Sequence, residues 1–461
     1  MSTISARIER MPFSSFHRRL LLMGGLGYTF DAMDAAVLAF LLPVLRTQWS
    51  LSSVQTGVLG SGTFIGYFLG AMLAGILGDL IGRRRVMMYA LVIYCVASLA
   101  SATAHDWPFF LATRIVAGLG TGAESAIVAP FLSEFVARRY RGAFTGSLAG
   151  FFSFGFVAAA LLGYLVIPLA PNAWRVVMVM VITALPIVML LWWRRALPES
   201  PRWLVARGRH AEAETIVARA EAELMAAGVK LEPLPETDAA AAAEVPVAAE
   251  RASVFANVKA LWSRKLARIT TMTWLMWLSI TFSYYAFFTW IPSLLVQNGM
   301  TIPRSFSYSL VIYIAQMPGY FSGAWLNEKI GRQATIASYM VLGGVSALGL
   351  ALTRSDAGIM LSGVLLSFFM NGTYAGVYAY TPEVFPTDVR ATGTGLASSI
   401  GRLGAIAAPI LVGYVYPLLG FPGVFGATTF VLLIGAAAVV LMGVPTRGRS
   451  LEDIAAQQLR G

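Results

Sequence analysis

The residues most able to do chemistry in this sequence are charged side chains that stand inside long apolar stretches. There are five of them: Asp31, Asp34, Arg114, Glu124 and Arg402. A charged side chain is costly in a hydrocarbon environment, so each is a functional candidate. A carboxylate beside an arginine can exchange a proton when its partner moves, and a separate arginine offers a fork of donors to an anion. The pattern predicts proton exchange and anion binding, and no enzymatic reaction.

The carboxylates of the first apolar stretch are expected to meet an arginine of the fourth. If the chain enters near Leu20, Asp31 lies ~16 Å along its helix and Arg114 lies at ~21 Å on the same scale. We therefore expect Asp31 and Arg114 to form the proton-coupling pair, with Asp34, one turn on, sharing the proton or accepting its own. A permanent ion pair that only joins two helices is the alternative. Glu124, ~15 Å nearer the face of the termini, is expected to be an inner proton acceptor or a helix–helix hydrogen-bond partner.

The second half of the chain carries the candidates for substrate binding. Arg402 lies ~16 Å along its stretch from Ala391, and we expect it to bind the carboxylate of an anionic substrate, with a structural ion pair as the alternative. At comparable depth, aromatic side chains would stack on a flat aromatic ring, and an amide or phenol would form a hydrogen bond with a ring nitrogen. Helix packing or interfacial anchoring is the alternative for the aromatic residues. These candidates are Trp277, Tyr284, Tyr285, Gln316, Tyr320, Asn371, Tyr374 and Tyr378.

The elements that must position these residues are membrane-spanning helices. Of the 461 residues, 57% are apolar or aromatic and only 12% are charged, which is too little charge to coat soluble domains. Each apolar stretch is roughly long enough to cross a ~30 Å hydrocarbon core. We therefore predict an all-α integral membrane protein with 12 transmembrane helices. The stretches are 20–45, 54–77, 86–104, 108–132, 143–168, 174–193, 269–298, 304–327, 333–353, 357–381, 391–416 and 422–443.

The basic residues indicate how the chain is oriented. The formal charge is +11, and 28 of the 34 Lys and Arg residues fall on the face that carries both termini. By the positive-inside rule that face is cytoplasmic. Four arginines fall in or beside loops of the opposite face: Arg46, Arg175, Arg304 and Arg354. The basic excess therefore predicts orientation and contact with membrane lipid, and not nucleic-acid binding.

The two halves of the chain echo each other, which indicates an internal duplication. A long polar interruption at 197–268 separates six stretches from six and includes the low-complexity run 239–243. We predict a six-helix bundle over 1–196, a cytoplasmic linker with short helices over 197–268, and a second six-helix bundle with a cytoplasmic tail over 269–461. The echoes are Gly78 to Arg85 with Asn327 to Arg332, and Glu134 to Arg141 with Glu383 to Arg390. Such repeats are typical of transporters that rock one half against the other.

These motifs resemble the major facilitator superfamily, near its sugar-porter branch. The resemblance rests on both echoes and on Arg114 with the glycines that follow it, Pro198 to Arg202, and the tail Pro445 to Glu452. It implies two pseudo-symmetric six-helix bundles. More narrowly, the bacterial niacin (nicotinate) transporters are similar in Phe30 to Asp34, Phe282 to Tyr285, Gln316 to Phe321, and Tyr380 to Thr387 with Arg390 to Gly393.

The resemblance also implies a conformational lock on the cytoplasmic face, with topological anchoring as the alternative. Its expected members are Asp79, Arg83, Glu134, Arg141, Glu328, Arg332, Glu383 and Arg390. The alternating glycines of 118–122 lie in a membrane span, where they favour close helix packing over nucleotide binding. The three histidines are scattered, so no metal site is expected.

The sequence thus predicts a monomeric secondary transporter of a bacterial cytoplasmic (inner) membrane, with both termini cytoplasmic and no cofactor. The expected activity is proton-coupled uptake of a small aromatic carboxylate by alternating access, with nicotinate favoured. The alternatives are another aromatic-acid/proton symporter, a sugar or polyol porter, an exporter of amphiphiles and, least favoured, a receptor that binds without transport.

Overall fold

The protein is helical throughout the part of the chain that the structure describes. The computed structural model describes residues 3–229, 231, 254–386 and 388–449. All regular secondary structure in these residues is helical, and ten helices are long and apolar enough to cross a membrane. The predicted all-α membrane class is therefore confirmed.

In the described residues up to 231, the chain forms ten α-helices, with one short 3₁₀ and one π-helical segment. Ile167–Leu169 is the 3₁₀ turn, and Met178–Ala184 is π-helical and continues α7 into α8. The α-helices are α1 (Thr3–Arg10), α2 (Ser15–Gln48), α3 (Ser53–Ile81), α4 (Arg83–Ala102), α5 (Trp107–Ser133), α6 (Arg138–Leu165), α7 (Ala173–Val177), α8 (Leu185–Ala196), α9 (Pro201–Ala206) and α10 (His210–Ala226).

Residues 254–386 and 388–449 form seven further helices. They are α11 (Val254–Leu261), α12 (Ala267–Gln297), α13 (Ile302–Ile314), α14 (Gln316–Ile330), α15 (Arg332–Leu352), α16 (Asp356–Glu383) and α17 (Arg390–Met442). The 53-residue α17 contains the eleventh and twelfth predicted stretches, and it breaks at Gly420, whose φ is 63°. Together α13 and α14 form the eighth stretch. The twelve predicted stretches therefore agree with the observed helices to within a few residues.

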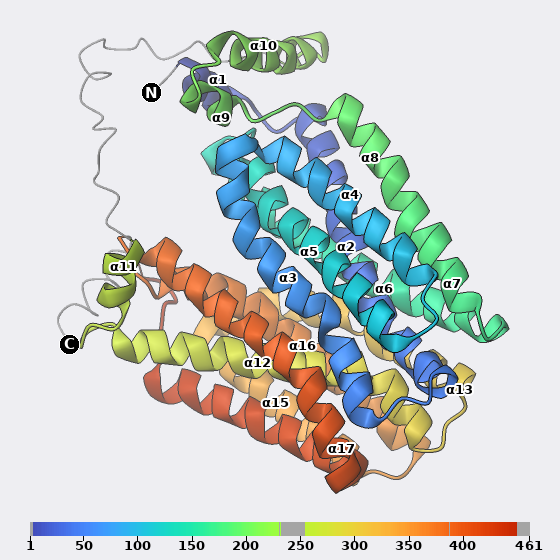
Figure 1. Ribbon diagram of the computed structural model, residues 1–461. Helices are drawn as coiled ribbons and strands as arrows, with labels where there is room; N and C mark the ends of the chain where they lie inside the picture. Colours follow the sequence, from blue (N-terminus) through green and yellow to red (C-terminus); the bar gives the residue numbers. More distant parts are fainter. Residues whose placement is uncertain (1–2, 230, 232–253, 387, 450–461) are drawn as a thin grey trace. The chain divides into compact units, whose positions relative to one another are not determined.

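The chain divides into two compact units by its internal packing. Unit 1 comprises Met1–Ala35, Gly62–Ala159 and Asn172–Ala249, and unit 2 comprises Ala36–Ser61, Ala160–Pro171 and Glu250–Gly461. In unit 1, α4 packs along α5 and α8, and in unit 2, α12 packs along α17 and α15 packs on α16 and α17 (Figure 1). Because the ends of α2, α3 and α6 group with unit 2, the predicted bundle boundaries 1–196 and 269–461 stay a prediction.

The linker contains the short helices that its sequence predicts. The helices α9 and α10 lie with α1 at one end of unit 1 (Figure 1), and α9 begins at the hydroxyl of Ser200, which accepts from the Trp203 backbone N–H. Pro201 at the first position suits a helix start, because its missing N–H would have no partner there. The alanine run 239–243 lies outside the described residues.

Glycines bring α3 and α5 into backbone contact in unit 1. A Cβ atom on Gly118 would lie 2.1 Å from the Thr63 carbonyl oxygen, and one on Gly122 would lie 2.1 Å from the Tyr67 carbonyl oxygen. In unit 2, α14 and α16 pack in the same way, because a Cβ on Gly319 would lie 2.3 Å from the Phe368 carbonyl oxygen. The glycines of 118–122 therefore serve helix packing, as predicted.

We predict that Gly122→Leu destabilises the protein by about 3 kcal/mol, because the new side chain meets backbone that cannot move aside. The measurement is the thermal midpoint and the monodisperse yield of the detergent-solubilised protein. The control is Gly146→Leu on α6, where a Cβ meets nothing within 4 Å. Equal midpoints for the two variants would contradict the close α3–α5 contact.

Candidate functional site

A buried ion pair joins α2 to α5 in unit 1. The Arg114 guanidinium lies 2.6 Å, Nη1 to Oδ1, from Asp34, and the two side chains are 1% and 0% exposed. Arg114 also donates through Nε to the Ser101 hydroxyl at 3.0 Å and through Nη2 to the Ser98 hydroxyl at 2.9 Å. Three helices, α2, α4 and α5, are therefore joined through one guanidinium, whose charge is paired with Asp34.

Two more carboxyl groups are buried on the same pair of helices. Asp31 Oδ2 accepts a hydrogen bond of 2.6 Å from the Ser125 hydroxyl, and its Oδ1 has no partner among the described residues. Glu124 is 1% exposed, and neither carboxyl oxygen has a partner in the described part of the chain. Its Oε1 lies against Gly27 of α2, where a Cβ would approach to 2.5 Å. The described residues of the site thus bring three carboxyl groups and one guanidinium into a buried interior.

The structure corrects the predicted partner of Arg114. The expected pair was Asp31 with Arg114, but the ion pair forms with Asp34, and Asp31 bonds to Ser125 instead. Asp34 is three residues further along α2, which adds ~4.5 Å to the ~16 Å depth of Asp31 and brings it level with Arg114. A depth known only to within a helical turn does not separate Asp31 from Asp34 as the partner of Arg114.

The serines around the ion pair were not among the predicted residues. Ser98 and Ser101 stand three positions apart in the apolar stretch of α4, so they share one helix face. Ser125 directly follows Glu124 on α5. A pair of hydroxyls at helical spacing inside an apolar span is the signal that could have identified them, because buried hydroxyls require partners.

The predicted aromatic residues form a connected cluster in unit 2. Tyr284 lies 5.2 Å, centroid to centroid, from both Tyr285 and Tyr374, and Trp277 lies 5.2 Å from Tyr378. The rings of Tyr374 and Tyr378 stack at 6.0 Å and complete the cluster. These five rings, from α12 and α16, contact one another, and their role in substrate binding stays a prediction.

Polar side chains form hydrogen bonds with residues of this aromatic cluster. The Tyr284 hydroxyl donates to Gln316 Oε1 at 3.0 Å, and Gln316 Nε2 is buried without a partner among the described residues. The Trp277 indole donates to the Thr381 hydroxyl at 2.9 Å, and the Tyr374 hydroxyl donates to the Thr281 hydroxyl at 3.2 Å. The Gln316 amide therefore keeps a donor that no described residue satisfies.

The remaining predicted binding residues lie apart from the ring cluster or at its edge. Asn371 uses its amide to donate to the Ser367 carbonyl at 2.9 Å, so one of its donors serves its own helix. The Tyr320 ring lies 6.4 Å from Phe321 on α14. Arg402 is half-buried on α17, directly after Gly401, which packs against Trp277.

The expected lock residues of unit 1 form a network at the ends of α4, α5 and α9. Arg83 Nε lies 2.8 Å from Glu134 Oε1, and Ser200 donates to the other carboxyl oxygen. Burial raises the pKa of Glu134, while the Ser200 hydrogen bond and the Arg83 charge act in the opposite direction. Arg141 donates to the Val136 carbonyl at 2.9 Å and pairs with Glu9 at 3.2 Å. The Asp79 side chain lies outside the described residues.

Unit 2 repeats this network at equivalent positions. Arg332 lies 3.1 Å from Glu383 and 2.8 Å from Glu328, and Arg390 donates to the Phe385 carbonyl at 3.2 Å. One sequence offset relates the two networks. It takes Arg83 to Arg332, Glu134 to Glu383, Val136 to Phe385 and Arg141 to Arg390. The same contacts at one offset indicate that the echoed motifs are a structural repeat.

The N-terminal helix α1 joins this network, which the sequence did not suggest. Glu221 of α10 accepts from Arg7 and Arg10 at 2.6 Å each, and Glu214 pairs with Arg7 as well. Burial raises the pKa of Glu221, but the hydrogen bonds from the two arginines outweigh it and hold that pKa below its ordinary value. Glu9 on the same short helix contacts Arg141 at 3.2 Å. Helix α1 is therefore held by charge at both α10 and the start of α6.

Comparison with known proteins gives one family over nearly the whole chain. The family model described as sugar (and other) transporter matches residues 23–457. The niacin transporter NiaP of Acinetobacter baylyi is 40% identical over 450 residues, which are 97% of this chain and 99% of that relative. A gallate transporter of Pseudomonas putida is 29% identical, over 95% of this chain and 94% of that relative. The relatives are transporters and not enzymes.

Solved structures show the same fold. The xylose transporter XylE from E. coli, in a partially occluded inward open conformation, is similar with a TM-score of 0.72 at 19% identity, over 95% of this chain and 100% of that chain. A bacterial homologue of the lysosomal transporter Spinster reaches 0.71 at 15% identity, over 97% of this chain and 99% of that chain. At these identities the likeness concerns the fold alone.

We predict that the attachment of α1 depends on pH through Glu221. Because the folded-state pKa lies below the ordinary value of 4.5, the stabilisation is complete above pH 4.5 and is lost as the pH falls through the lowered value. At pH 7, Glu221→Gln should weaken the attachment by about 2 kcal/mol, since hydrogen bonds to charged groups are lost. Hydrogen–deuterium exchange of residues 3–10, corrected for intrinsic rates, measures this.

The matched control is Glu223→Gln, which removes a neighbouring carboxylate of α10 that pairs with Arg19 of α2. It should leave the exchange of α1 unchanged. If Glu221→Gln and the wild type exchange α1 equally at pH 7, the charge clamp does not hold this helix.

Proposed function

Because this chain belongs to the sugar (and other) transporter family of the major facilitator superfamily, we propose that it takes up nicotinate together with protons by alternating access. The observation that carries the proposal is the 40% identity to a niacin transporter along essentially the full length of both chains. The chain is a multi-pass membrane transporter, and the substrate and the coupled ion are the proposed parts.

Proton coupling is supported by the charge balance of the α2–α5 site. Asp31, Asp34 and Glu124 bring three carboxyl groups to the single guanidinium of Arg114. Burying a carboxylate without a compensating charge is costly, so the carboxyl groups in excess favour binding protons. Asp31 and Glu124 are these groups, since Asp34 already holds Arg114. Asp31 and Glu124 then carry the transported proton, and the Asp34–Arg114 pair sets the local charge.

Substrate binding is supported by the second half of the chain. A pyridine ring is flat and matches the edge and face contacts of Trp277, Tyr284 and Tyr374, while the free amide donor of Gln316 can address the ring nitrogen. Arg402, next to the Gly401–Trp277 contact, would hold the carboxylate. The other proposed binding residues are Tyr285, Tyr320, Asn371 and Tyr378.

The lock and the orientation complete the proposal. The lock would stabilise one conformation at the face that carries the termini. Its centre is the pairs Arg83–Glu134 and Arg332–Glu383, and its further members are Arg141, Arg390, Glu328 and Asp79. We place that face in the cytoplasm of a bacterium, with the monomeric chain in its inner membrane and the basic residues against lipid headgroups. A second aromatic acid is the runner-up substrate, since a gallate transporter is among the relatives.

The proposed substrate is tested by uptake of labelled nicotinate into proteoliposomes under an imposed inward proton gradient. We expect saturable accumulation that collapses with the gradient, strong competition by benzoate, and at least tenfold weaker competition by nicotinamide and by glucose. A carboxylate-binding arginine and an aromatic site predict this order. Competition by glucose alone would indicate a sugar porter. Competition by nicotinamide equal to that by benzoate would contradict the role of Arg402 in binding the carboxylate.

Proton coupling is tested with Asp31→Asn, which keeps the shape of the side chain and removes its titration. We expect gradient-driven accumulation to fall at least tenfold and to lose its pH dependence, while nicotinate exchange across the membrane in the absence of a gradient continues. Asp356→Asn is the control, since that carboxylate is half-exposed at the start of α16 and pairs with Arg304. Full accumulation with the original pH profile in Asp31→Asn would rule out its proton role.

A further inference from the structure

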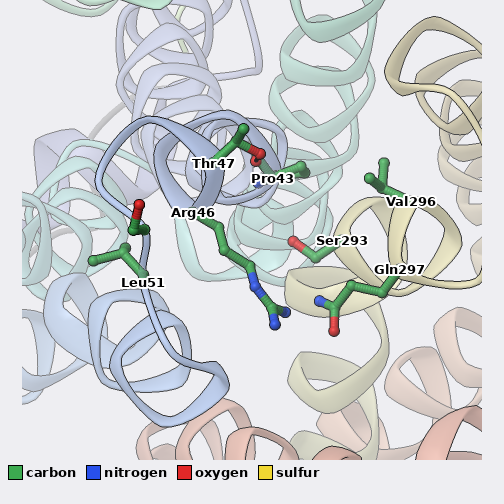
Figure 2. A pocket seen from close by; sticks show the side chains of 8 residues that line it. Pro43, Arg46, Thr47, Leu51, Ser293, Val296 and Gln297 are labelled. Carbon is green, nitrogen blue, oxygen red and sulfur yellow. Dashed lines mark hydrogen bonds between the residues drawn. The ribbon is translucent and has the colours of Figure 1, made fainter.

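A polar pocket lies in unit 2, where the C-terminal ends of α2 and α12 come together. Its volume is about 480 Å³, which is in the range of small-molecule sites. Figure 2 shows the side chains of Arg46 and Gln297 pointing toward each other, with Ser293 beside them. The lining residues are Pro43, Arg46, Thr47, Ser50, Leu51, Ser293, Val296 and Gln297.

The polar atoms of this pocket have donors and acceptors left over. Arg46 donates through Nη2 to the Ser53 hydroxyl at 3.2 Å, but its buried Nη1 has no partner among the described residues. The same holds for both amide atoms of Gln297 and for the hydroxyl of Ser293, a side chain that is 1% exposed. Buried polar groups are normally satisfied, so three such side chains around one cavity indicate that a ligand completes them.

The charge of the pocket is positive. In the described part of the chain no carboxylate forms an ion pair with Arg46, and its Nη2 donates to the neutral Ser53 hydroxyl. The carbonyls at the two helix ends are already used: Arg46 O accepts from Leu51 N at 3.0 Å, and Leu294 O accepts from Asn298 N at 2.9 Å. The guanidinium is therefore the dominant charge that faces the cavity.

The shape and chemistry of the lining select a class of ligand. A guanidinium with an unpartnered Nη1 matches a carboxylate oxygen, and the Gln297 amide and the Ser293 hydroxyl add donors beside it. Pro43, Leu51 and Val296 supply an apolar wall for the rest of the molecule. A small organic monocarboxylate with an apolar body fits this combination better than an inorganic anion or a sugar.

We propose that this pocket is a second binding site, which captures the carboxylate substrate before it reaches the aromatic cluster. The site lies at the end of α2 remote from the N-terminus, and hence on the outer face in the proposed orientation. The identity of the ligand rests on the proposed function, because an importer of aromatic acids meets its substrate on that face. Arg46 binds the carboxylate, and Gln297 and Ser293 orient it.

The test uses a reporter at the rim of the pocket. Thr47→Cys is introduced into a Cys95→Ser background, so that the reporter is the one cysteine, and intact cells are labelled with a membrane-impermeant maleimide. We expect saturating nicotinate or benzoate to slow labelling at least tenfold, and nicotinamide or sulfate to leave the rate within twofold. Equal protection by sulfate would overturn the assignment to carboxylates.

Three variants in this background separate the pocket from other causes of protection. Arg46→Gln should abolish protection and raise the KM for uptake about tenfold with kcat unchanged. Arg304→Gln, which removes another arginine expected on the same face, should keep protection. Arg402→Ala should also keep it, because the two sites are distinct. Protection that survives Arg46→Gln, or that is lost in Arg402→Ala, would overturn the proposal.

The experiment distinguishes this proposal from the proposed function. Normal nicotinate uptake without any protection would overturn the pocket alone. Protection by benzoate that requires Arg46, in cells that take up no nicotinate, would support the pocket and contradict the proposed substrate.

Discussion

The buried Arg114–Asp34 ion pair is the contact on which the rest of the first unit depends. Its guanidinium ties α2 to α5 and, through Ser98 and Ser101, to α4. Removing one partner would leave a buried charge without a counter-charge, which is far more costly than never having had the pair. Arg114 pairs with Asp34, and Asp31 accepts a hydrogen bond from the neutral Ser125 hydroxyl instead.

The two halves of the protein share a scaffold but not this chemistry. The arginine–glutamate contacts at the helix ends and the glycine-mediated crossings of helices occur in both halves. At the offset that relates these contacts, Asp34 corresponds to Ser283 and Arg114 to Gly363. The charges that could carry protons thus stand in the first half, and the aromatic surface stands in the second. A duplicated frame with divided roles suits a carrier whose halves move against each other.

Much of the architecture could be predicted from the residues. Stretches of apolar residues longer than a bilayer needs can only be helices, because every backbone N–H and C=O must be satisfied within the chain. The resemblance to the niacin transporters is confirmed by the relatives, and the fold by solved structures at TM-scores above 0.7. The helix-packing role of Gly118 and Gly122 also followed from their setting.

The sequence by itself determined the membrane class, the helices, the internal repeat and the burial of Asp31, Asp34, Arg114 and Glu124, since these follow from hydrophobicity along the chain. Only the tertiary structure decided partners: Arg114 with Asp34, Glu134 with Arg83, and α1 clamped by Glu221. It alone revealed the pocket at Arg46, whose lining comes from segments more than 200 positions apart. Helix spacing sets the depth of a residue to within a turn, but rotation and close approach decide which neighbours it touches.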